Sequence, residues 1–146
     1  MDVLHEFQRL LRVLGSQLRY GTLSRAPLRL VRLAFEEETV RCDWLLRPPD
    51  VLDHGLNPEW RDRRVAIEAL HDALTMRELV FTTLPQARFG ELRAFSESSG
   101  AARILMIAGN VSREAEPGHR TPSMVMRALS CGFRFRLSNG FLEPLE

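Results

Sequence analysis

Residues 28–49 read LRLVRLAFEEETVRCDWLLRPP and carry the pattern that decides the fold. In the second half of this stretch, apolar and polar residues alternate. One side of the chain carries Val40, Cys42, Trp44 and Leu46, and the other carries Arg41, Asp43, Leu45 and Arg47. Such alternation is typical of a strand with one buried face. Residues 28–35 are also extended in pattern, and the glutamates at 36–38 suit a hairpin tip. The stretch therefore predicts two antiparallel strands.

Two later segments repeat the hairpin pattern. Residues 89–111 contain two extended runs separated by Ser98, Ser99 and Gly100, which favour a turn. The second run, Arg103 to Ala108, is apolar on both faces, which is typical of a central strand covered on each side. Near the end of the chain, Phe133 to Leu137 alternates again and is followed by Asn139 and Gly140, a pair that favours tight hairpin turns.

Three segments have the features of helices. Apolar residues recur at helical spacing from residue 3 to 18. Residues 57–59 combine a capping asparagine, a proline and an acid, which predicts the start of a second helix that runs to about Phe81. Thr121 and Pro122 predict the start of a third helix, and Gly132 its end. Each predicted helix precedes a predicted hairpin.

These elements predict a single α+β domain over residues 1–146. We expect an antiparallel sheet of about six strands with three helices packed mainly on one face, in the order αββ-αββ-αββ. This order alone is similar to the layout of type III secretion chaperones and related small α+β dimers. Those chaperones are typically acidic, whereas this chain has a formal net charge of +1, and none of their motifs is matched.

The basic residues are unusual, because all 20 are arginine and none is lysine. We attribute this to the coding bias of a GC-rich bacterial genome. The alternative is selection for planar guanidinium groups that bind carboxylate or phosphate in a bidentate manner. The 19 acidic residues leave no clustered positive excess, so nucleic acid is not an expected partner. The polar N-terminal residues and the lack of a long apolar run predict a cytoplasmic protein with no membrane segment.

No motif for catalysis, metal binding or nucleotide binding stands out in the chain. Cys42 and Cys131 lie in apolar patterns without metal-ligand spacing, so we expect buried structural thiols and neither a metal nor a cofactor. The segment around residues 50–60 contains Asp53, His54 and Trp60. An aspartate beside a histidine can orient a general base, but neighbours in the chain rarely reach the required geometry, so a solvated loop is the interpretation we favour.

Four arginines lie on the polar faces of two predicted strands: Arg41, Arg47, Arg134 and Arg136. If helices cover one face of the sheet, these side chains form a basic stripe on the other, which would suit an acidic helix or a second copy of the protein. The alternative, which we favour, is that they pair across strands and each contribute under about 1 kcal/mol. The expected acidic partners are Asp43, Glu91 and Glu143.

The glutamates at 36–38 have two interpretations as well. They either pair with arginines of a partner or keep the hairpin tip soluble, and we favour the second. The sequence as a whole predicts a non-enzymatic protein-binding module that acts as a homodimer through the sheet face or through the strand at residues 103–108. The alternative is a small-molecule-binding protein or enzyme with a pocket under the loop at residues 50–60.

Overall fold

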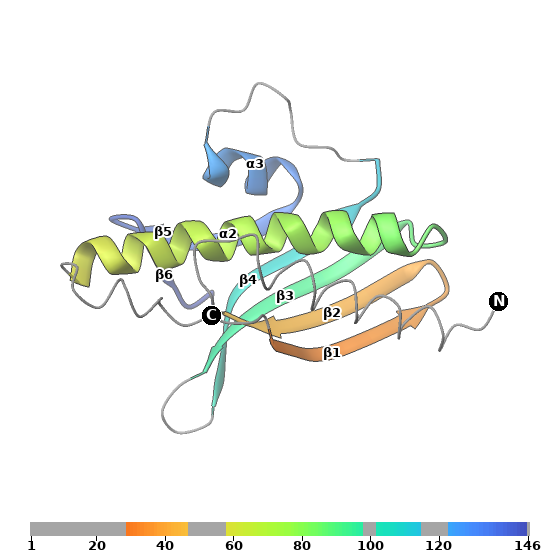
Figure 1. Ribbon diagram of the computed structural model, residues 1–146, viewed down its shortest axis with the longest axis horizontal. Helices are drawn as coiled ribbons and strands as arrows, with labels where there is room; N and C mark the ends of the chain where they lie inside the picture. Colours follow the sequence, from red (N-terminus) through yellow and green to blue (C-terminus); the bar gives the residue numbers. More distant parts are fainter. Residues whose placement is uncertain (1–28, 47–57, 98–101, 115–122, 146) are drawn as a thin grey trace.

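The computed structural model describes residues 29–46, 58–97, 102–114 and 123–145 (Figure 1). Their six strands form one sheet in the order β1-β2-β3-β4-β5-β6, and the helix α2 lies along one face of it. In chain order the elements are β1 (Arg29–Glu36), β2 (Thr39–Leu45), α2 (Pro58–Thr83), β3 (Phe89–Glu97), β4 (Arg103–Ser112), α3 (Met124–Ser130), β5 (Phe133–Ser138) and β6 (Phe141–Glu143).

The sheet is mixed, so the expectation of a purely antiparallel sheet is wrong. β2 and β3 run parallel, whereas the other neighbouring strands run antiparallel. The reason is that α2 connects β2 to β3. Such a helical crossover carries the chain back to the edge of the sheet at which β2 begins, so β3 starts there and runs in the same direction as β2. The expectation of three helices is also corrected, because the described residues contain two. The helix predicted at residues 3–18 lies outside the described part of the chain.

The hairpins predicted at both ends of the sheet are confirmed. β1 and β2 are joined by a two-residue turn at Glu37 and Glu38. In the turn between β5 and β6, Asn139 has φ 54° and Gly140 has φ 86°, the geometry that an Asn-Gly pair adopts in tight hairpins. A Cβ atom at Gly140 would lie only 2.9 Å from Cγ of Arg63, whose Nε donates to the carbonyl of Asn139 at 3.2 Å. This turn therefore packs closely against the first turns of α2.

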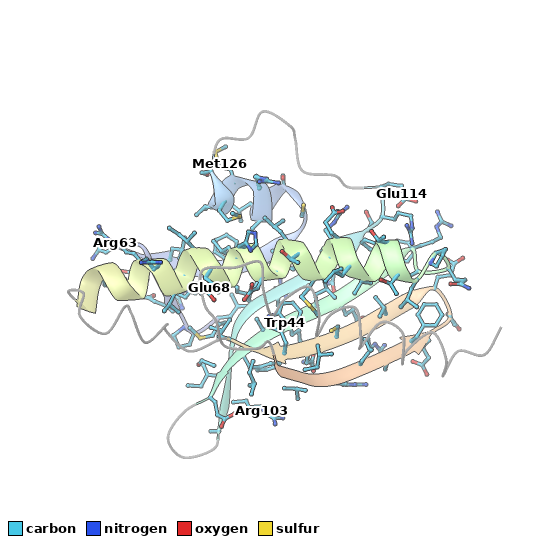
Figure 2. All side chains as sticks on the ribbon, in the orientation of Figure 1. Trp44, Arg63, Glu68, Arg103, Glu114 and Met126 are labelled. Atoms are coloured by element: carbon cyan, nitrogen blue, oxygen red, sulfur yellow. The ribbon has the colours of Figure 1, made fainter. Side chains whose placement is uncertain are left out.

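The hydrophobic core lies between α2 and the sheet. Trp44 is fully buried on the sheet below α2 in the view of Figure 2. Other large side chains that are fully buried are Val40, Leu70, Met76, Val80, Leu84, Leu92, Ile107 and Phe133. Burying a side chain of this size stabilises the fold by roughly 1.5–3 kcal/mol. Phe133 crosses directly over Gly109, where a Cβ atom would lie 2.6 Å from the phenyl ring.

The ends of the two helices are set by local contacts. α2 begins at Pro58 as predicted and ends at Thr83, two residues later than expected. α3 begins at Met124 and not at residue 121, because the Ser123 side chain caps it by accepting a hydrogen bond from the backbone N–H of Met126. Gly132 follows α3 with φ 98°, which confirms its predicted role after the last helical residue.

The Arg113 side chain binds the connection that follows α2. Its Nε donates to the carbonyl of Ala87 at 2.9 Å, and its Nη2 donates to the carbonyl of Leu84 at 2.8 Å. The guanidinium also lies 5.0 Å from the centre of the Phe81 ring. These contacts hold the end of β4 against the end of α2.

Candidate functional site

The sheet face opposite α2 carries a line of charged side chains. Because Val40, Cys42 and Trp44 point into the core, the alternating positions on β2 point away from it. Strand register aligns five such positions across the sheet, which we call the arginine row: Arg32, Asp43, Arg93, Ala108 and Arg134. Adjacent strands are about 4.8 Å apart, so the row extends over roughly 19 Å.

Asp43 and Arg93 form the tightest ion pair of this face. Nε of Arg93 donates to Oδ1 of Asp43 at 3.0 Å, and Nη2 donates to Oδ2 at 2.8 Å. This hydrogen bonding raises the pKa of Arg93 above its ordinary value. The Arg93 guanidinium also lies 5.3 Å from the centre of the Phe95 ring. The pair therefore joins the two parallel strands β2 and β3 through a bidentate contact.

Two cross-strand pairs expected from the sequence are confirmed. Nε of Arg41 lies 2.9 Å from Oε2 of Glu91, its register partner on β3. On the last hairpin, Nη2 of Arg136 lies 4.0 Å from Oε2 of Glu143. The third expected acid, Asp43, pairs with Arg93 and not with Arg41, because register places Arg93 directly beside it.

In two arginines of the row, the guanidinium N–H donors are not used by other described residues. Within the part of the chain that the structure describes, the side chains of Arg32 and Arg134 make no hydrogen bond and no ion pair. Both line an open depression of about 270 Å³. Its full lining is Arg32, Arg41, Asp43, Glu91, Arg93, Ala108, Gly109, Asn110 and Arg134. Four guanidinium groups meet two carboxylates there, so the depression has a formal charge of +2.

The structure brings together two of the four arginines singled out in the sequence. Arg41 and Arg134 line the same depression, although they belong to β2 and β5. Arg136 lies two residues further along β5 and is engaged with β6. Arg47 lies outside the described residues.

The second predicted site is not described by the structure. Asp53 and His54 lie outside the described residues, and so does the side chain of Trp60, whose backbone belongs to the first turn of α2. The expectation of a pocket under the loop at residues 50–60 therefore concerns a part of the chain about which the structure gives no geometry.

Sequence reasoning missed Arg32 and Arg93. Leu92 and Ala94 point into the core, so simple alternation places Arg93 on the open face. Its pairing with Asp43, however, depends on the parallel register of β2 and β3. For Arg32 the alternation itself is interrupted, because the register of β1 shifts between Leu30 and Arg32. A bulge of this kind changes which side chains share a face.

The two thiols are buried, as predicted. Cys42 is fully covered, and its burial raises the pKa of the thiol far above the ordinary value. Burial also raises the pKa of Cys131. Both thiols therefore stay protonated near neutral pH, and a thiolate nucleophile is disfavoured at either position.

The described residues lack two other kinds of functional feature, a metal-binding cluster and a membrane-spanning helix. Across residues 29–46, 58–97, 102–114 and 123–145, no three His, Cys, Asp or Glu side chains are grouped so that they could hold a metal ion. In that same part of the chain, no helix combines the length and apolar character needed to cross a bilayer. Comparison with protein-family models, with curated proteins and with solved structures found no match to this chain.

Proposed function

We propose that this chain is a non-enzymatic protein-binding module that acts as a cytoplasmic homodimer through the sheet face opposite α2. The observation that carries the proposal is the arginine row, in which Arg32 and Arg134 have no partner among the described residues. Guanidinium groups in such a row suit carboxylates of a docked protein segment, and complementary charge sets the orientation and rate of association.

The chain itself supplies a complementary segment. The acidic tip, residues 36–38, is exposed at the turn between β1 and β2. Glu36 lies 3.7 Å from Nη1 of Arg41 and Glu38 lies 4.0 Å from Nη1 of Arg88, but their side chains remain 78% and 57% exposed. Glu37 makes no hydrogen bond or ion pair with any described residue. An exposed acidic tip and an arginine row on one molecule make two copies of that molecule complementary.

The spacing of these groups allows reciprocal contact. Arg32 and Glu37 are five residues apart, which corresponds to roughly 16 Å along an extended strand. A two-fold axis that crosses β1 midway between them places Arg32 of each copy against the acidic tip of the other. Such an isologous interface uses the same patch twice. Ala34 and Phe95, both half-buried, add apolar surface to the same face.

The test is the mass in solution, measured by light scattering with size-exclusion chromatography. We expect the wild-type protein at twice the chain mass of 16.7 kDa. Arg32→Glu and Glu37→Arg should each shift the equilibrium toward monomer, because each places like charges together. The double variant Arg32→Glu/Glu37→Arg should restore the dimer, because it exchanges the two charges.

Arg136→Glu is the matched control, since Arg136 lies on the sheet but outside the row and is engaged with Glu143. It should leave the mass unchanged. A wild-type protein that is monomeric at its highest soluble concentration contradicts the proposal. So does a dimer that persists in both single reversals.

A further inference from the structure

The arginine row has a gap at β4. Register places Ala108 between Arg93 and Arg134, so the two arginines are separated by two strand spacings, or about 10 Å. A methyl group occupies the position between them and forms the floor of the depression together with Gly109. Asn110, which is exposed, lies two residues further along β4 on the same face and lines the same depression.

Several hydrogen-bond donors border this gap and are not used by the protein. Arg134 makes no hydrogen bond among the described residues, so its guanidinium retains five N–H donors. Arg93 uses Nε and Nη2 for Asp43, which leaves its Nη1. Asn110 adds a carboxamide that can donate two further hydrogens. Glu91, the register partner of Asn110, also lines the depression and forms an ion pair with Arg41 at 2.9 Å.

We propose that the gap binds a small dianion, presented as a phosphate group or as a dicarboxylate. Arg134 is the main donor, and Nη1 of Arg93 and the carboxamide of Asn110 complete the site. The formal charge of +2 on the depression matches such a ligand. Planar guanidinium groups bind both carboxylate and phosphate oxygens in a bidentate manner. A volume of about 270 Å³ is close to that of the smallest ligand pockets and accommodates a compact polar molecule.

The test is a titration with inorganic phosphate and, separately, with succinate in a low-salt buffer, followed by NMR of the labelled protein. We expect saturable shifts at Ala108, Asn110 and Arg134. Arg134→Gln should weaken binding by about tenfold or more, because it removes a charge-assisted contact. Arg136→Gln, on the same strand and outside the depression, should bind as the wild type does.

The two titrations distinguish phosphate-bearing ligands from dicarboxylates. Binding of phosphate alone assigns the site to phosphate-bearing ligands, and binding of succinate alone assigns it to dicarboxylates. Binding of both shows that a small dianion is sufficient. Each of these outcomes supports the proposal, provided that Arg134→Gln weakens the binding that is observed. The proposal is overturned if neither phosphate nor succinate binds saturably. It is also overturned if the wild type and Arg134→Gln bind the ligand equally well.

This site does not depend on the homodimer. The titration is repeated on Glu37→Arg, a variant changed at the acidic tip and not in the depression. If the wild-type protein is monomeric, the proposed homodimer fails while the titration still decides the dianion site. The melting temperature of Arg134→Gln provides a check on folding, since Arg134 is exposed and should tolerate the change.

Discussion

Replacing Arg93 by leucine tests whether the Asp43–Arg93 pair holds the two parallel strands together. Asp43 is 5% exposed and accepts hydrogen bonds of 3.0 and 2.8 Å from Arg93. Arg93→Leu leaves this carboxylate almost fully covered and without its cation. The Arg93 side chain, by contrast, is 43% exposed, so water partly solvates the guanidinium in the folded protein.

The expected cost follows from this asymmetry. Removing one partner of a fully buried ion pair costs about 3–5 kcal/mol, whereas exposed pairs contribute about 0.2–1 kcal/mol. With a buried acid and a half-exposed base, we expect Arg93→Leu to lower the free energy of unfolding by about 2 kcal/mol, within the range for hydrogen bonds to charged groups. Asp43→Leu should cost less, because water can solvate the arginine that remains.

The assay is urea unfolding followed by tryptophan fluorescence, compared at equal m-values. The double variant Asp43→Leu/Arg93→Leu should be more stable than the sum of the two single effects predicts, with a coupling of about 1 kcal/mol or more. Arg136→Leu is the control, because its pair with Glu143 is exposed and 4.0 Å long. If Arg93→Leu costs no more than this control, or if the two single effects add without coupling, the pair does not hold β2 to β3.

Three further outcomes are expected from the structure. Gly109→Ala should destabilise the fold by about 1–3 kcal/mol, because its Cβ would lie 2.6 Å from the Phe133 ring; adding Phe133→Leu should recover part of the loss in melting temperature. Arg113→Gln removes the guanidinium that donates three hydrogen bonds to carbonyls after α2, so amide hydrogen exchange at the end of α2 should accelerate severalfold without global unfolding. Since burial raises the pKa of Cys42, the folded thiol keeps a proton that the unfolded chain loses above about pH 9. Wild-type stability should therefore fall by about 1.4 kcal/mol per pH unit above that pH, relative to Cys42→Ala, as chemical unfolding at several pH values would show.

Local features of the fold were predictable because the contacts that cause them are local. The period of two in residues 40–46 depends only on which side of β2 is buried. The Asn139–Gly140 turn and the start of α2 at Pro58 follow from the backbone preferences of those residues. The strand, the turn and the helix start are confirmed, and none requires knowledge of which strands become neighbours. Burial along β2 does not alternate after Cys42, however, because Asp43 and Leu45 on the other side are only 5% and 4% exposed.

The direction of β3 was not predictable in the same way. Grouping the chain as helix followed by hairpin suggests that each hairpin is a separate antiparallel unit. The same order can equally be divided into strand, helix and strand, and the structure adopts that division for β2, α2 and β3. Whether β3 runs parallel or antiparallel to β2 depends on the end of the sheet to which α2 carries the chain. That end is set by packing between residues that are distant in the sequence.

The candidate site shows the same division between local and distant causes. Alternation alone placed Arg41 and Arg134 on polar strand faces, and they line one depression. Whether an arginine on this face pairs depends on its cross-strand neighbour, and therefore on register, and also on whether that neighbour is already engaged. Arg32 faces Asp43, but both carboxylate oxygens of Asp43 accept from Arg93. Arg93 has Asp43 beside it, whereas Arg134 has Ala108.

Register therefore assigns two roles to chemically identical side chains on one face. Arg41 and Arg93 pair with the acids beside them and connect strands. Arg134 lies beside Ala108, and Arg32 lies beside Asp43, whose two oxygens already accept from Arg93, so both keep donors for a ligand or a second copy. Salt should separate these roles. Because Asp43 is almost fully buried, its pair is screened weakly, whereas contacts made by exposed guanidinium groups weaken as the Debye length falls from about 30 Å at 0.01 M to about 8 Å at 0.15 M. Raising the ionic strength should then reduce association and dianion binding while changing the free energy of unfolding of the monomer little.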